Sequence, residues 1–198
     1  MNRKVLASTG QAMVTLPNLL TMLRIAVIPV FVREVLEQRF GWALITFLIA
    51  GISDGLDGLL ARKLGQKSEF GEKLDPIADK LLLVTAFVIL TLPGKGYQPI
   101  PLWVTATMVL RDLVILSGAL AIMAFTTIKR FPPSMLGKIS TVAQIVTVLI
   151  FMLAQLGDSL AGYLVLSYYL TFIMAVLSGA HYVLRGLQMV GAQRREQR

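Results

Sequence analysis

The sequence predicts an all-α integral membrane protein, a bundle of six transmembrane helices. Of its 198 residues, 56% are hydrophobic and 15% are charged, whereas a typical soluble domain is about 45–50% apolar and about 25% charged. The mean hydropathy is +0.72. The apolar residues gather in stretches near the ~20 residues that a membrane-spanning helix needs. A helix satisfies its backbone hydrogen bonds internally, so it is the structure that such stretches adopt in lipid.

Six apolar stretches follow one another along the chain. Pro17 suits the start of the first helix. Turn residues around Gly94 and at Pro132-Pro133 separate later stretches. Because no linker or low-complexity segment interrupts them, we expect one membrane domain over residues 1–198. Its predicted spans cover residues 16–32, 42–60, 74–92, 102–126, 139–156 and 164–184.

The positive charge of the chain indicates its orientation in the membrane. The formal net charge is +8, and in a membrane protein Lys and Arg mark cytoplasmic loops and meet anionic headgroups, so we expect no nucleic-acid partner. The loops predicted to lie opposite the termini contain only Arg33, Arg39 and Lys95 as basic residues. The pattern therefore predicts a multi-pass protein of a bacterial inner membrane with cytoplasmic termini. The absence of cysteine excludes disulfides and thiol catalysis.

Four aspartates lie within the second and third stretches, where a charge is costly unless it is paired, hydrated or bound to metal. Asp54 and Asp57 are three residues apart, and Asp75 and Asp79 are four apart, so each pair shares one face of a helix. The polar loop expected at residues 62–73 would hold the two helices antiparallel and adjacent. We therefore expect both pairs to face one cavity, at the cytoplasmic ends of these spans.

This cavity has the chemistry of a divalent metal site. Four carboxylates around a small space repel one another unless cations neutralise them, and all-oxygen ligation suits Mg²⁺, Mn²⁺ or Ca²⁺. Gly58, Gly71 and Ala61 lie beside the acids, where small residues admit a bulky ligand or serve helix packing. Arg62 follows by one turn, where it can bind phosphate or mark a cytoplasmic loop.

The acids and their neighbours form one frame, D-x2-D-G-x2-A-R-x8-G-x3-D-x3-D, from Asp54 to Asp79. This frame resembles, at all eight fixed positions, the signature of the CDP-alcohol phosphotransferase (CDP-alcohol phosphatidyltransferase) family. The resemblance extends to Pro17-Asn18-Leu19-Leu20-Thr21-x-x-Arg24 in the first span and Gly137-Lys138 at the fifth. It covers roughly residues 16–185.

The resemblance implies a six-helix fold with a cytoplasmic site and two Mg²⁺ or Mn²⁺ ions held by Asp54, Asp57, Asp75 and Asp79. It implies transfer of a phosphatidyl group from CDP-diacylglycerol to a glycerol-type alcohol, with release of CMP. Asp75 and Asp79 would be the catalytic acids, and Asp79 the base that deprotonates the alcohol. Homodimerisation agrees with the resemblance, although the sequence shows no interface. The substrate-contacting residues would be Asn18, Thr21, Gly58, Ala61, Arg62, Gly71, Arg111 and Lys138.

The alcohol acceptor is the open point. The sequence is similar to the phosphatidylglycerophosphate synthase branch, which uses glycerol 3-phosphate, and to the cardiolipin synthase branch, which uses phosphatidylglycerol. The first branch typically has a second Arg where this chain has Ala119, and a Lys where it has Ser140. Two cations that would hold a phosphorylated acceptor are thus missing. Glycerol 3-phosphate remains the leading expectation, with phosphatidylglycerol as the alternative.

Other interpretations of these residues exist. Arg111 can pair structurally with Asp112 inside the fourth span, and Asn18 and Thr21 can serve helix capping or helix–helix hydrogen bonds. A cation transporter could use the same four carboxylates, but broken helices and internal repeats, which often mark transporters, are not evident. A membrane scaffold would leave four aligned acids unexplained.

Overall fold

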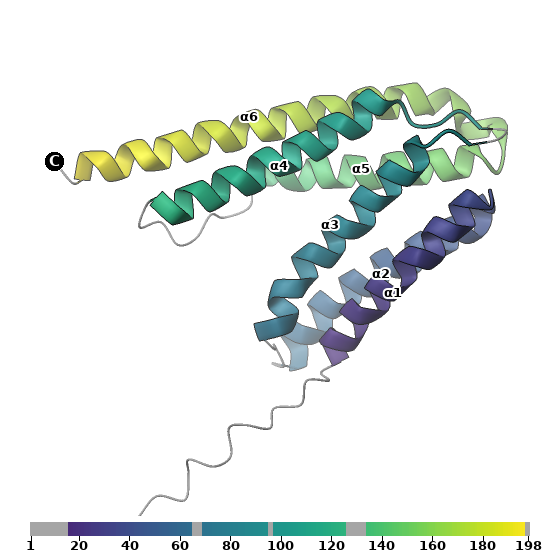
Figure 1. Ribbon diagram of the computed structural model, residues 1–198, viewed down its shortest axis with the longest axis horizontal. Coiled ribbons are helices and arrows are strands. Elements are labelled where there is room, and N and C mark those ends of the chain that lie inside the picture. The colour runs from purple at the N-terminus through teal and green to yellow at the C-terminus, as the bar shows by residue number, and fades with distance from the viewer. Residues whose placement is uncertain (1–15, 65–68, 95–96, 126–133, 197–198) are drawn as a thin grey trace, which may run out of the picture. The chain divides into compact units, whose positions relative to one another are not determined.

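The computed structural model describes residues 16–64, 69–94, 97–125 and 134–196, and this part of the chain contains helices and no β-strand (Figure 1). The predicted all-α fold with six α-helices is confirmed. The chain forms two compact units, Met1–Thr85 and Ala86–Arg198, and the division falls within the third helix. The elements are α1 (Leu16–Leu36), α2 (Phe40–Leu64), α3 (Glu69–Thr91), α4 (Leu102–Phe125), α5 (Met135–Ala154), the 3₁₀-helix η1 (Asp158–Tyr163) and α6 (Leu164–Glu196).

Several of these helices have the length and composition of membrane spans. Three segments of the described chain are long and apolar enough to cross a bilayer, namely Leu102–Ile122, Met135–Ala154 and Leu160–Gly191. Two shorter apolar helical segments are Phe40–Ser53 and Lys80–Thr91. Their outward side chains are largely aliphatic, as on α4, where Leu110, Leu113 and Leu116 are exposed. An apolar outer surface of this extent is stable in lipid and not in water, so the chain is a membrane protein.

In the first unit, α1 and α2 form a helical hairpin (Figure 1). Phe31 of α1 and Phe47 of α2 are buried, with ring centroids 5.9 Å apart. Ala43 and Ala50 are also buried, and such small residues let two membrane helices approach closely. The helices are therefore held by close packing of aromatic and small side chains.

The turn between α1 and α2 is polar and tightly connected. Gln38 has a φ of 60°, in the left-handed region that reverses the chain direction. The Arg33 Nε donates to Glu37 Oε1 at 2.8 Å, and the Arg39 Nη2 lies 3.2 Å from Glu37 Oε2. The hydrogen bond from Arg33 lowers the pKa of Glu37 below its usual value. This end of the hairpin is thus charged and suited to an aqueous surface.

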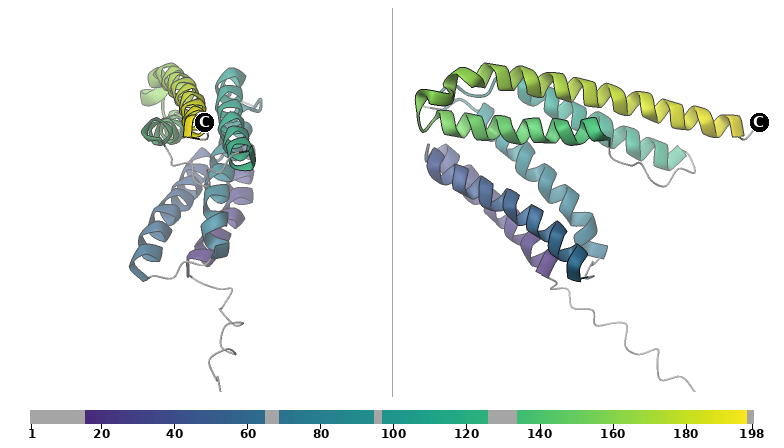
Figure 2. Two further views of the ribbon diagram at one scale, coloured as in Figure 1. Left: turned by 90° about the vertical axis from the view of Figure 1, so that its left-hand side faces the viewer. Right: turned by 180° about the vertical axis from the view of Figure 1, so that it is seen from behind.

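In the second unit, α4, α5 and α6 lie side by side, with α6 parallel to α4 and antiparallel to α5 (Figure 2). Trp103 of α4 packs against Tyr169 and Phe172 of α6, with both pairs of ring centroids 5.5 Å apart. The Thr91 and Thr105 hydroxyls, 2.6 Å apart, join the end of α3 to α4.

The α5–α6 contact contains a buried polar pair. The Thr147 and Thr171 hydroxyls are 2.8 Å apart, Thr147 also donates to the Ser167 carbonyl, and Thr171 donates to the Ala143 carbonyl. Within a membrane, hydroxyl pairs of this kind link neighbouring helices.

Thr147→Val is expected to lower the stability of the protein by about 1 kcal/mol, because it removes a buried hydroxyl that bonds across the α5–α6 contact. The measurement is thermal unfolding in detergent. Thr107→Val is the matched control, since the Thr107 hydroxyl bonds only to Trp103 of its own helix. Thr171→Val should lower the stability less in the Thr147→Val variant than in the unaltered protein, since the two hydroxyls are partners. Additive losses would contradict this coupling.

The helices extend beyond the predicted spans. The polar loop expected at residues 62–73 is largely helical, because α2 continues to Leu64 and α3 begins at Glu69. At the fifth helix, Ser134 accepts a hydrogen bond from the Gly137 backbone N–H at 3.0 Å and starts α5 at Met135. The fifth helix thus starts four residues before the predicted span at residue 139. The count of six membrane crossings remains a prediction.

Candidate active site

The acid frame lies on the backbone of two consecutive helices of the first unit. Asp54 and Asp57 are within α2, and Asp75 and Asp79 are within α3. The i,i+3 and i,i+4 spacings are therefore realised on helices, and each pair shares a helix face as the sequence predicted. Only residues 65–68 separate the ends of α2 and α3.

The positions of the acids along the two helices are matched. Asp57 precedes the last residue of α2 by seven positions, and Asp75 follows the first residue of α3 by six. Asp54 and Asp79 are each ten positions from the same ends. At 1.5 Å per residue, these positions are about 10 and about 15 Å along each helix from the connection. Antiparallel packing of α2 and α3 would place the acids in two levels, Asp57 with Asp75 and Asp54 with Asp79.

The frame's side chains, at residues 54–64 and 69–79, lie outside the described part of the structure, as do those of Asn18 and Thr21. The predicted roles of Gly58, Ala61, Arg62 and Gly71 therefore stay predictions. Among the side chains that the structure describes, no group of acids or histidine forms a metal site. The donor set itself fits a hard divalent cation, since it contains four carboxylates and no softer ligand.

The second unit holds a buried cation, Arg111 of α4, which is 8% exposed. Its Nη1 donates to Asp112 Oδ1 at 2.6 Å, and its Nη2 donates to Ser178 Oγ of α6 at 2.6 Å. A Cβ added to Gly137 of α5 would lie 3.3 Å from the same Nη2. The guanidinium thus lies where α4, α5 and α6 meet, and glycine at position 137 leaves room for it.

Three buried donors on α4 and α5 have no hydrogen-bond partner within the described part of the chain. They are Arg111 Nε, Ser140 Oγ and Gln144 Nε2. Ser140 and Gln144 lie on the face of α5 that begins at Gly137, since the three residues are spaced by three and four. A buried donor without a partner costs about 1–3 kcal/mol, which a ligand rich in oxygen would recover. We call Arg111, Ser140, Gln144 and Ser178 the Arg111 cluster.

The structure therefore brings together some of the residues predicted to bind the acceptor and not others. Arg111 and the first turn of α5 come together, and the expected pair of Arg111 with Asp112 also forms. The Lys138 side chain, on this turn, is exposed. The contribution of Ser178 was not predicted, because a serine in an apolar helix 67 residues from Arg111 carries no signal in the sequence.

Arg24, another cation within a predicted span, is 1% exposed on α1. A fully buried guanidinium in a membrane helix faces the protein interior and marks a polar environment there. Arg24 belongs to the first unit, as does the acid frame.

Comparison with known proteins agrees with the frame. A model of the CDP-alcohol phosphatidyltransferase family matches residues 14–181. The chain is 34% identical over 188 residues to a probable phosphatidylglycerophosphate synthase of Mycobacterium tuberculosis, covering 90% of this chain and 85% of that protein. It is 33% identical to CDP-diacylglycerol–glycerol-3-phosphate 3-phosphatidyltransferase of Bacillus subtilis, covering 86% of this chain and 94% of that protein.

A relative with a different acceptor is also similar over a shorter stretch. The chain is 39% identical over 109 residues to a CMP-forming cardiolipin synthase of Streptomyces coelicolor, which covers 52% of this chain and 48% of that protein. The family model spans the acid frame, both units and the Arg111 cluster. The chain therefore belongs to the CDP-alcohol phosphatidyltransferase family, enzymes of phospholipid biosynthesis.

Proposed function

We propose that this enzyme transfers a phosphatidyl group from CDP-diacylglycerol to glycerol 3-phosphate and releases CMP. The observation that carries the proposal is the complete acid frame, placed on two helices that only four residues connect. The relatives that cover most of this chain are named for this acceptor. In the reaction, a bond forms between the acceptor oxygen and the phosphatidyl phosphorus, and the bond from that phosphorus to CMP breaks.

The four frame aspartates are the residues that would hold divalent metal, in our proposal two Mg²⁺ or Mn²⁺ ions. When bound, such ions neutralise the pyrophosphate and stabilise the departing CMP. Asp79 takes the proton of the acceptor hydroxyl, for which a carboxylate within hydrogen-bond reach suffices. Asp75 holds the metal beside it. Positioning and charge neutralisation supply most of the remaining rate enhancement.

The other frame residues bind CDP-diacylglycerol. Gly58 and Ala61 leave space for the cytidine phosphates along α2, and Gly71 does so on α3. Arg62 donates to a phosphate. On α1, Asn18 and Thr21 contact the nucleotide.

Arg111 is the proposed contact for the acceptor, with Lys138 beside it at the start of α5. Its guanidinium keeps an Nε donor without a partner in the described chain, and Arg binds phosphate oxygens with good geometry. Ser140 and Gln144 present further donors to an oxygen-rich ligand.

Phosphatidylglycerol is the second candidate acceptor. Ser140 and Ala119, which replace two expected cations, are both neutral. A lipid acceptor needs fewer cations and more apolar surface than a small phosphate ester.

The deciding experiment compares acceptors. Purified protein in detergent with CDP-diacylglycerol and Mg²⁺ should release CMP when glycerol 3-phosphate is added, and the product should be phosphatidylglycerophosphate. If the protein instead forms cardiolipin from phosphatidylglycerol, phosphatidylglycerol is the acceptor and glycerol 3-phosphate is not. No CMP release with either glycerol-type alcohol, or CMP release with inositol phosphate alone, would contradict the proposal.

Chelation of divalent ions by EDTA is expected to abolish CMP release, because four carboxylates at close range need cations to neutralise them. Returning excess Mg²⁺ or Mn²⁺ should restore the rate. A monovalent salt of equal ionic strength is the control. Undiminished activity after complete chelation would remove the metal assignment.

We also propose that the enzyme lies in the inner membrane with its termini and acid frame on the cytoplasmic side, and that it forms a homodimer. The basic residues of the loops support the orientation. The similarity to the family supports the dimer.

A further inference from the structure

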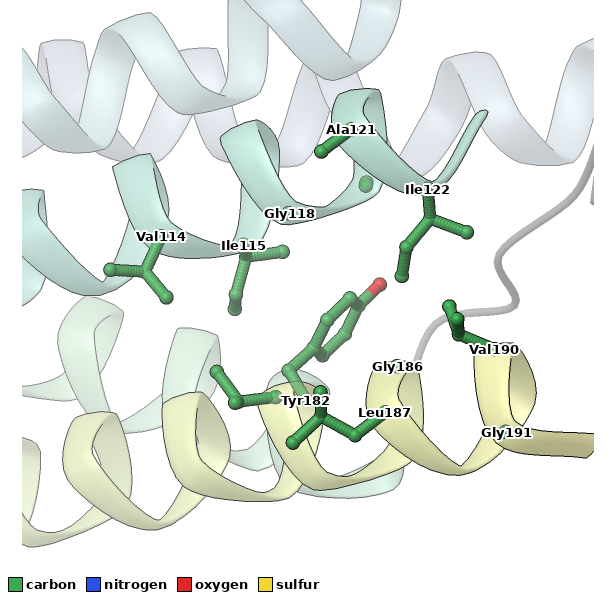
Figure 3. A pocket seen from close by; sticks show the side chains of 12 residues that line it. Val114, Ile115, Gly118, Ala121, Ile122, Tyr182, Gly186, Leu187, Val190 and Gly191 are labelled. Carbon is green, nitrogen blue, oxygen red and sulfur yellow. The ribbon is translucent and has the colours of Figure 1, made fainter. Parts of the chain in front are cut away.

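A pocket of about 470 Å³ lies between α4 and α6, entirely within the second unit (Figure 3). On α4 it extends from Val114 to Ile122, and on α6 from Tyr182 to Gly191. Every lining side chain except that of Tyr182 is aliphatic or absent. A pocket this apolar is suited to a hydrocarbon ligand.

Glycines leave space in the pocket, at the middle of its α4 side and at one end of its α6 side. A Cβ added to Gly118 or to Gly191 would meet no atom within 4 Å. Figure 3 shows the Tyr182 ring between the two helices, with the flanking aliphatic side chains around it. The pocket is therefore a groove with free space beside Gly118 and Gly191.

The length of the groove matches one leaflet of a bilayer. At 1.5 Å per residue, the lining segments are about 12 Å long on α4 and about 14 Å long on α6. Half of a hydrocarbon core of about 30 Å is about 15 Å. Both helices qualify as membrane spans, so the occupant available along this groove is a lipid chain.

The charge beyond the groove selects the headgroup. Arg194 and Arg195 follow Val190 and Gly191 by four residues on α6, so these positions are one helical turn past the end of the groove. Basic residues at a helix end near the membrane surface attract the headgroups of anionic lipids.

We propose that the groove between α4 and α6 binds one acyl chain of an anionic phospholipid, whose headgroup lies at the arginine end of α6. This lipid is a bound component of the protein and is separate from the reacting substrates. The proposal does not depend on which alcohol the enzyme uses.

Native mass spectrometry of the purified full-length protein tests this with dioleoyl phosphatidic acid, which has no alcohol to act as acceptor. The unaltered protein should retain one such lipid when detergent is stripped, and should retain dioleoyl phosphatidylcholine at least tenfold less. Gly118→Leu and Gly191→Leu, which fill the groove at its middle and at one end, should each lose the lipid. Ala106→Leu, at an exposed position of α4 outside the groove, should keep it.

A second measurement needs no substitution. Phosphatidic acid with a photoreactive acyl chain should label peptides that contain residues 114–122 and 182–191. Retention of the lipid by both leucine variants, labelling elsewhere only, or equal retention of the neutral lipid would overturn the proposal. A dimer that the leucine variants abolish would overturn it as well, because a second copy would then fill the groove. CMP release is measured separately, so its failure would affect the proposed function and not this site.

Discussion

The protein with Asp79→Asn is expected to release CMP at least about a hundredfold more slowly than the unaltered protein at saturating Mg²⁺. A general base typically contributes about 10²–10⁴-fold to the rate, and the amide of asparagine cannot take the acceptor proton. Asparagine has nearly the same size, so α3 should remain helical around position 79. The measurement is CMP release by the purified protein in detergent, with helix content followed by circular dichroism.

Two variants separate the base role from the metal role. Asp54→Asn removes a carboxylate at the same distance from the α2–α3 connection as Asp79. The CMP release lost in this variant should be partly recovered by raising the metal concentration. The loss of CMP release in Asp79→Asn should not be recovered by a higher metal concentration. Glu37→Gln makes the same chemical change at the exposed hairpin turn and should leave the rate unchanged. Near-normal turnover of Asp79→Asn would remove the base assignment.

The sequence predicted the helices better than it predicted their ends. Hydropathy marks the depth of the bilayer, whereas a helix ends where its backbone hydrogen bonds stop. The run Ala61-Arg62-Lys63-Leu64 is polar in part but consists of good helix formers, so α2 continues through it. For the same reason α6 continues to Glu196, beyond the predicted end at residue 184. The 3₁₀-helix η1 was not predicted.

The acid frame was predictable because its chemistry is local. Two carboxylates within one helical turn are visible in the sequence, and the structure has each pair on one helix, α2 or α3. That the two helices bring the pairs together stays a prediction. The Arg111 cluster depends on tertiary packing instead. Ser178 lies on α6 and Gln144 on α5, and neither is near Arg111 in sequence, so only the packed helices relate them. Polar residues scattered through apolar spans carry no information on which of them meet.

Arg111→Met is expected both to destabilise the protein and to weaken acceptor binding. Removing one partner of a buried ion pair costs about 3–5 kcal/mol, because the other charge loses that partner while it stays away from water. Here that charge is Asp112, whose side chain is 14% exposed. Ser178 also loses its donor at 2.6 Å. Thermal unfolding in detergent measures the first effect, and the acceptor concentration at half-maximal CMP release measures the second.

A double variant distinguishes the structural role of Arg111 from its binding role. Arg111→Met with Asp112→Leu removes both charges, and a buried pair replaced by apolar residues is often neutral or stabilising. The double variant should therefore unfold close to the temperature of the unaltered protein. Its half-saturating concentration of glycerol 3-phosphate should still be raised about tenfold or more, which corresponds to about 1.4 kcal/mol of lost binding. If the double variant recovers both stability and acceptor affinity, Arg111 only pairs with Asp112, and the acceptor phosphate binds to other residues.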